Sequence, residues 1–166
     1  MKKVLAIFLA FIIGLSMSAQ IQNKLLGFTL GTSTKYEIRN KYKNERSFSE
    51  EDSFIMVRDI RFASQHWDYV AFYFFENKLM YVSFSNIDPY TPMRLMESTW
   101  DNLKERLWDK YSDYYVKTTP EMIQYSDGVT NLALSLSDAT GSMILMLLYS
   151  DVALKNQELQ AGDDEL

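Results

Sequence analysis

The feature that most constrains the fold is a pair of apolar runs separated by a two-residue turn. Trp67 to Phe75 and Lys78 to Ser85 are joined by Glu76-Asn77, and this arrangement predicts a tight antiparallel hairpin. Side chains alternate between the two faces of a strand, yet this hairpin has apolar residues in both sets of positions. Both faces must therefore be covered by a helix, another sheet, a second copy or a ligand.

Strict alternation divides the side chains of this hairpin between two faces. The first face holds Val70, Phe72, Phe74, Leu79 and Tyr81. The second face holds Trp67, Tyr69, Tyr73, Phe75, Met80, Val82 and Phe84. We expect helices to cover the first face, because its Phe and Leu side chains are smooth and tyrosines tolerate a wet edge. The candidate partner-binding residues are therefore Trp67, Tyr69, Tyr73 and Phe75; the alternative interpretation is that Tyr69 and Tyr73 are ordinary core residues.

Helix and strand patterns follow one another twice along the chain. Thr34 and Glu37 have capping-box spacing and predict a helix over Lys35 to Tyr42, ahead of the apolar segment Phe54 to Phe62 and the hairpin. Thr91-Pro92 predicts the start of a longer helix that ends near Ser112. Its apolar residues recur at three- and four-residue spacing, and Trp100, Leu103 and Leu107 should face the sheet. Four more apolar segments follow: Tyr114 to Thr118, Met122 to Tyr125, Val129 to Ser137, and Met143 to Tyr149.

This order predicts an α+β fold in which helices cover one face of an antiparallel sheet. A single domain spans residues 20–150, and its halves, about 20–86 and 87–150, are compatible with two helix-plus-three-strand units. Residues 151–166 are expected to form a short helix and an acidic tail. The repetition fits an ancient duplication and fits convergence on one packing pattern equally well.

The first nineteen residues have the pattern of a secretory signal peptide. Lys2 and Lys3 precede an apolar stretch from Val4 to Leu15 and then small residues, with a cut expected between Ala19 and Gln20. The apolar stretch is shorter than the roughly 20 residues that a membrane-spanning helix needs. The chain contains no cysteine, which excludes disulfides, thiolate chemistry and a lipid-carrying cysteine at the cut. We therefore expect an exported protein, periplasmic or extracellular, without a membrane span after processing.

The charge of the processed chain argues against nucleic-acid binding. Removing Lys2 and Lys3 leaves 15 basic residues against 22 acidic ones, a formal charge of −7. Recognition of a phosphate backbone needs a net or clustered positive surface. The densest basic stretch, from Arg39 to Arg46, is interleaved with Glu45 and preceded by Glu37, which is typical of a solvated helix face.

Part of the chain resembles the domain shared by beta-lactamase inhibitor protein and the BamE-like outer-membrane lipoproteins. The resemblance covers roughly Leu25 to Ser85, with LGFTLGTSTKYEI followed by a loop and AFYFFENKLMYVSF. The matching positions are Gly31, Thr34, Glu37, Ile38, Phe74, Phe75, Asn77 and Leu79. The resemblance implies a fold of helices on an antiparallel sheet, and it does not transfer the assembly or inhibitor function.

Catalytic and metal-binding patterns are scarce in the sequence. His66 is the only histidine, so it has no partner at the spacing of a zinc site, and Glu50-Glu51-Asp52 lacks the alternation and central glycine of a calcium loop. The serines have no nucleophile-elbow motif around them. We predict no cofactor, no metal and no enzymatic activity. Convergence of Asp68, Asp88, Asp109 and Asp113 on a glycoside-cleaving pair is left open by the sequence.

Three functions from different classes are compatible with these patterns. The favoured hypothesis is an exported, non-enzymatic binding module in the cell envelope that holds a protein or glycan on an aromatic sheet face, because tyrosine and tryptophan offer large contact area at low entropic cost. The alternative is a structural or self-associating envelope protein that uses the same face as a homodimer interface. A carboxylate-based hydrolase is the third hypothesis, and it requires two acidic residues about 5–10 Å apart in a pocket.

Overall fold

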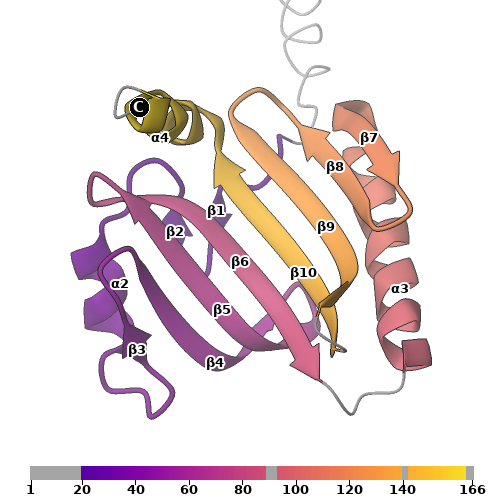
Figure 1. Ribbon diagram of the computed structural model, residues 1–166, viewed down its shortest axis with the longest axis horizontal. Coiled ribbons are helices and arrows are strands. Elements are labelled where there is room, and N and C mark those ends of the chain that lie inside the picture. Colours follow the sequence, from indigo (N-terminus) through magenta and orange to yellow (C-terminus); the bar gives the residue numbers. More distant parts are fainter. Residues whose placement is uncertain (1–19, 89–92, 140–141, 164–166) are drawn as a thin grey trace, which may run out of the picture.

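The computed structural model describes residues 20–88, 93–139 and 142–163 of the chain. The predicted signal peptide, the Thr91-Pro92 helix start and the last three residues lie outside the described residues. The described chain is α+β, as predicted, with one eight-stranded antiparallel sheet and a small two-stranded sheet (Figure 1). Its elements are β1 (Lys24–Leu25), β2 (Phe28–Thr29), α2 (Lys35–Tyr42), β3 (Ser49–Glu50), β4 (Phe54–Phe62), β5 (Gln65–Phe75), β6 (Lys78–Asp88), α3 (Met93–Tyr111), a 3₁₀ turn (Ser112–Tyr114), β7 (Tyr115–Thr119), β8 (Met122–Ser126), β9 (Thr130–Ala139), β10 (Ser142–Asp151) and α4 (Val152–Asp163).

The strand order of the large sheet is mirrored about its centre. The strands run β3-β4-β5-β6-β10-β9-β8-β7, so the final strands of the two halves, β6 and β10, pair with each other in the middle. In each half, one helix is followed by four strands of the large sheet, one strand more than the three expected, and the first half also contains β1 and β2. In the first half the additional strand is the two-residue β3, which lies inside the polar segment between α2 and β4 and carries no apolar pattern.

The first helix starts with the predicted capping box. The Thr34 backbone N–H donates to Glu37 Oε2 at 2.7 Å, and the Glu37 N–H donates to Thr34 Oγ1 at 3.3 Å. Just before this cap, Gly31 adopts a φ of 78° and its N–H donates to the Leu79 carbonyl at 2.8 Å. A residue with a positive φ is thus needed where the chain leaves the small sheet and reaches β6.

Two tight turns join the three long strands of the first half. Glu76 and Asn77 both have positive φ, 48° and 63°, which confirms the predicted hairpin between β5 and β6. Ala63 and Ser64 have φ values of 53° and 59° and connect β4 to β5 in the same manner. Positive φ at both central residues matches the right-handed twist of the paired strands.

Helices α2 and α3 pack on the same face of the large sheet. Trp100, Leu103 and Leu107 of α3 are buried against β9 and β10, which confirms the predicted inward face of that helix. On α2, the buried ring of Tyr42 stacks on Phe72 of β5 with centroids 5.8 Å apart. We call the sheet face against which α2 and α3 pack the covered face. Its apolar side chains and those of the two helices form a continuous core across both halves.

The last helix lies beside one end of the sheet (Figure 1). Asp151 precedes α4, and its Oδ1 accepts a hydrogen bond from the Leu154 N–H at 2.9 Å, which satisfies a free donor at the helix start. Leu154 is buried, and Glu158 one turn later accepts a hydrogen bond from Tyr81. Within the described chain, no helix combines the length and apolar character that a membrane crossing requires.

Candidate functional site

The large sheet has a second face, opposite the one that α2 and α3 cover, which we call the open face. Figure 1 shows those two helices at the margins of the sheet and α4 at one end. Strand pairing places the side chains of the open face in three rows that run across six strands. The rows are Phe54-Tyr73-Tyr81-Ser150-Asn131-Ser126, Met56-Ala71-Ser83-Leu148-Ala133-Gln124 and Arg58-Tyr69-Ser85-Met146-Ser135-Met122.

The composition of these rows is unusual for a solvated sheet. Ser83 and Ser150 are buried and Arg58 is exposed, while the other members are partly exposed. Aromatic, methionine and small residues dominate, and no row contains Lys, Asp or Glu. This face, rich in aromatic and methionine side chains and left uncovered by α2 and α3, is the strongest candidate for a binding surface in the described part of the chain.

One row carries a cluster of three aromatic rings. The ring of Tyr73 lies 5.5 Å from that of Phe54 on β4 and 6.0 Å from that of Tyr81 on β6. The Tyr81 hydroxyl donates to Glu158 Oε2 at 2.6 Å, so α4 borders this end of the open face. Burial, followed by the hydrogen bond and the negative charge of Glu158, raises the pKa of Tyr81 to about 12. The hydroxyl therefore stays protonated at neutral pH.

The opposite row has a cationic side chain beside an aromatic ring. The guanidinium of Arg58 lies 5.2 Å from the ring centroid of Tyr69, within the range of a cation–π contact. In the middle row, the short side chains of Ala71, Ser83 and Ala133 alternate with larger ones, since Leu148 lies between Ser83 and Ala133. The face offers apolar area, tyrosine hydroxyls and one cation to a ligand.

The four residues predicted to bind a partner do not all lie on this face. Tyr69 and Tyr73 do, and the partly exposed Phe75 lies at the end of β5, opposite Lys78. Trp67 is 0% exposed and belongs to the core, where its indole N–H donates to the Phe62 carbonyl at 3.2 Å. The assignment of Trp67 to the tyrosine face was therefore wrong.

An irregularity in β4 and β5 explains the position of Trp67. Trp67 and Val70 are three positions apart and both are buried, although strict alternation would separate them. Their partners Ile60 and Val57 show the same spacing, and Asp59 between them has a φ of 61°. The pleat therefore changes phase at this point, as at a bulge.

A bulge near the turn of the hairpin moves two more residues to the covered face. The register shifts between Tyr73 and Phe74, because Tyr73 pairs with Tyr81 and Phe74 with Leu79, which leaves Met80 as an extra residue in β6. Leu79 and Val82 are consequently both buried. Val82 and Phe84 pair with Phe72 and Val70, so they lie on the covered face and not beside the tyrosines as strict alternation predicted.

The acidic residues and the histidine are distributed over different elements. His66 Nε2 lies 2.6 Å from Asp59 Oδ1 on the exposed surface. Asp68 Oδ2 accepts a hydrogen bond from the Ile87 N–H in β6, whereas Asp109 lies on α3 behind the other face of the sheet. The side chain of Asp88 lies outside the described residues. No group of three potential metal ligands is present in the described ranges.

Sequence reasoning missed several members of the open face. Tyr81, Met146 and Leu148 were not assigned to it, because their position depends on the bulge at Met80 and on the pairing of β6 with β10. The available signal was the apolar segment Met143 to Tyr149, which has more apolar side chains than one covered face needs. Alternation within that segment places Met146 and Leu148 together.

Comparisons with protein-family models, curated proteins and solved structures returned no match. The resemblance to the inhibitor and lipoprotein domain therefore stays a prediction.

Proposed function

We propose that this protein is an exported, non-enzymatic binding module that holds a partner protein against the open face of its sheet. The observation that carries the proposal is the partly exposed surface of the three rows centred on β5, β6, β10 and β9, which is rich in aromatic and methionine side chains and contains no Lys, Asp or Glu. Tyr69, Tyr73 and Tyr81 supply rigid amphipathic contact area, since a tyrosine fixes only two side-chain torsions on binding. The role in the cell envelope follows from the predicted signal peptide.

A protein partner fits the composition better than a glycan does. The centres of protein interfaces are enriched in aromatic residues, Met and Arg and depleted in Lys, Glu, Asp, Ser and Ala. These rows share the enrichment and the lack of Lys, Glu and Asp, although they also contain five serines and two alanines. A glycan buries many hydroxyl groups, and each needs a hydrogen-bonding partner. Met56, Ala71 and Leu148 in the middle row provide no such partners. We therefore propose that the partner is a protein whose contact surface is largely apolar and packs against tyrosine rings.

The direct test is capture of partners from envelope extract with variants of the face. Tyr69→Ser combined with Tyr73→Ser should reduce the captured protein by about 30-fold or more, the effect of losing interface hot spots worth about 2 kcal/mol. Tyr36→Ser is the matched control, because Tyr36 is 66% exposed on α2 away from this face. Equal loss in the control variant would contradict the proposal.

A second variant blocks the face without removing aromatic packing. Ser135 lies between Met146 and Met122 and is partly exposed, so Ser135→Arg adds a bulky charge where a partner would dock. We expect capture to fail while the melting temperature stays nearly constant. Asn102→Arg on the exposed side of α3 is its control. Undiminished capture by Ser135→Arg would place the partner elsewhere.

Two other results would assign the face to a different occupant. Retardation of the protein by a polysaccharide gel, lost in Tyr69→Ser/Tyr73→Ser, would show a glycan site. A dimer in light scattering that Ser135→Arg dissociates would show that a second copy covers the face. Either result, without a captured protein, overturns the protein-partner proposal.

The exported location has its own measurement. Mass spectrometry of periplasmic or secreted material should find an amino terminus at or within a residue or two of Gln20. Recovery of intact Met1 in a membrane fraction would contradict export and processing.

A further inference from the structure

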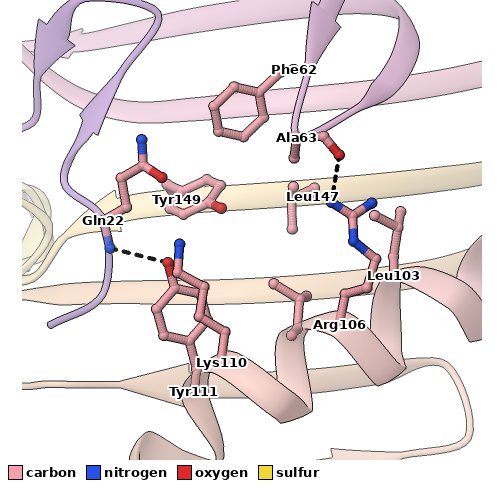
Figure 2. A pocket seen from close by; sticks show the side chains of 10 residues that line it. Gln22, Phe62, Ala63, Leu103, Arg106, Lys110, Tyr111, Leu147 and Tyr149 are labelled. Carbon is pink, nitrogen blue, oxygen red and sulfur yellow. Dashed lines mark hydrogen bonds between the residues drawn. The ribbon is translucent and has the colours of Figure 1, made fainter. Parts of the chain in front are cut away.

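A cavity of about 410 Å³ lies on the covered side of the sheet, between α3, β10 and the turn after β4. It is separated from the open face by the sheet itself, since Leu147 and Tyr149 of β10 point toward the helices. Figure 2 shows Arg106 and Lys110 rising from α3 toward the ring of Tyr149 and the turn at Ala63. The volume is near the lower end of the range for small-molecule sites, about 300–1,000 Å³.

The inner wall of the cavity is apolar. It is formed by Phe62 from β4, Leu103 and Leu107 from α3, and Leu147 from β10. These groups come from both halves of the chain. Such a wall favours hydrocarbon, at about 0.8 kcal/mol for each buried methylene group.

The rim of the cavity carries two cationic side chains, Arg106 and Lys110, both of which are exposed. Arg106 gives one hydrogen bond, from Nη2 to the Ala63 carbonyl at 2.9 Å, and Lys110 contacts the ring of Tyr111 with its ammonium 4.9 Å from the centroid. Neither cation forms an ion pair with a carboxylate of the described chain. No acidic residue lines the cavity. The site therefore has uncompensated positive charge.

Two tyrosine hydroxyls add donors at the same place. Tyr149 is only 3% exposed and lines the cavity, and its hydroxyl forms no hydrogen bond to a described residue. Burial, and then the neighbouring hydroxyl of Tyr111, raises the pKa of Tyr149 well above its ordinary value, so the group stays a donor. The Tyr111 oxygen accepts from the Gln22 N–H at 3.4 Å, which leaves its own proton free to donate (Figure 2). An acceptor bound in the cavity would give both hydroxyls a partner for their protons.

We propose that this cavity binds a small anionic amphiphile, with its hydrocarbon chain against Phe62, Leu103 and Leu147 and its negatively charged head held by Lys110, Arg106 and the Tyr149 hydroxyl. A cation is disfavoured by the two basic side chains, and a neutral alcohol leaves both of them without a counter-charge. This site does not depend on the open face and is a separate function of the fold.

The first experiment is calorimetric titration of the purified protein with decanoate. We expect decanoate to bind saturably with one-to-one stoichiometry. 1-Decanol and decyltrimethylammonium have the same hydrocarbon chain but a neutral and a positively charged head group, and they should bind at least tenfold more weakly than decanoate. Decyl phosphate is the second anionic probe, and the tighter of the two anions identifies the natural head group as carboxylate or phosphate. Absence of decanoate and decyl phosphate binding overturns the proposal, as does equal binding of the cationic probe.

Two variants with matched controls locate the site. Lys110→Met should weaken decanoate binding about tenfold or more, since a hydrogen bond to a charged group is lost. Lys104→Met is the matched control. Lys104 is exposed on α3 outside the cavity lining, so this substitution should leave the affinity for decanoate unchanged. Tyr149→Phe should also weaken binding, while its melting temperature stays equal or rises because the removed hydroxyl has no partner in the described chain. Unchanged affinity in both Lys110→Met and Tyr149→Phe would refute this site.

A further control separates this site from the open face. Ser135→Arg and Tyr69→Ser/Tyr73→Ser should bind decanoate as the unaltered protein does, because the sheet lies between the two surfaces. Decanoate binding that disappears in these variants and persists in Lys110→Met would mean that the amphiphile occupies the open face, and would contradict the cavity assignment.

Discussion

Tyr81 on β6 and Glu158 on α4 are joined by a hydrogen bond of 2.6 Å that ties the last helix to the edge of the open face. The two residues are 77 positions apart in the chain. The contact fixes the position of α4 at the aromatic end of the surface, next to Tyr73. It also makes the ionisation of Tyr81 a term in the stability of the protein.

The first prediction concerns the pH dependence that Tyr81 causes. Its pKa of about 12 in the folded chain exceeds the ordinary value of about 10, so the unfolded chain loses this proton first as the pH rises. Stability from the Tyr81–Glu158 contact is complete below pH about 10 and is lost between pH about 10 and 12. Urea unfolding from pH 8 to 11.5 should show Tyr81→Phe less stable at pH 8 and the difference shrinking above pH 10. A constant difference would contradict the shifted pKa.

The second prediction concerns Tyr125, whose hydroxyl is buried without a hydrogen-bond partner in the described chain. Burial, followed by the neighbouring Tyr115, raises the pKa of Tyr125 to about 12. Tyr125→Phe removes an unsatisfied polar group and keeps the ring packing, so the free energy of unfolding should be unchanged or about 1 kcal/mol higher. Denaturant unfolding measures this. A loss above about 1 kcal/mol would show that the hydroxyl has a stabilising partner.

The third prediction tests the packing of α3. Leu103 is 3% exposed between α3 and the sheet, so Leu103→Ala should lower the free energy of unfolding by about 2–5 kcal/mol. Lys104→Ala, on the exposed side of the same helix, should change it by less than about 0.5 kcal/mol. An effect below about 1 kcal/mol for Leu103→Ala would mean that α3 packs differently.

The fourth prediction compares two glycines with similar backbone angles. Gly31 and Gly128 have φ of 78° and 84°, so alanine strains both positions. A Cβ at Gly31 would lie 2.6 Å from Asp151 Oδ2, whereas a Cβ at Gly128 meets no atom within 4 Å. Gly31→Ala should therefore cost more than Gly128→Ala in thermal unfolding. Equal costs would show that Asp151 yields freely.

Elements defined by neighbouring residues were predicted well from the sequence. The capping box at Thr34, the turn at Glu76-Asn77 and the inward face of α3 all depend on residues within a few positions of each other. Each is set by local backbone preference or by helical periodicity. The α+β class followed from their order along the chain.

The face assignment failed where the pleat changes phase. A one-residue irregularity exchanges the two faces of a strand, and its position depends on the partner strand. Asp59 and Met80 give no strong local signal of their irregular positions, so Trp67 was placed beside Tyr69 when it lies in the core. Tyr69 and Tyr73 were placed correctly relative to each other because no irregularity separates them.

The cavity was beyond reach of sequence reasoning for a different reason. Its lining comes from Gln22, Phe62, Lys110 and Tyr149, which tertiary packing alone brings together. The only local signal was the helical spacing of Arg106 and Lys110 beside Leu103 and Leu107. Such spacing is common on the border of any amphipathic helix.

The mirrored strand order has a consequence for fragments of this protein. Among the described strands, the halves of the large sheet pair only through β6 and β10. A cut between Asp88 and Met93 followed by separation would therefore leave each half with one long, unpaired, apolar edge. Bare edges of this kind recruit other strands. Each half expressed alone should therefore associate with a copy of itself. The resulting two-fold symmetric dimer would have an eight-stranded sheet like that of the intact chain, formed from two identical halves.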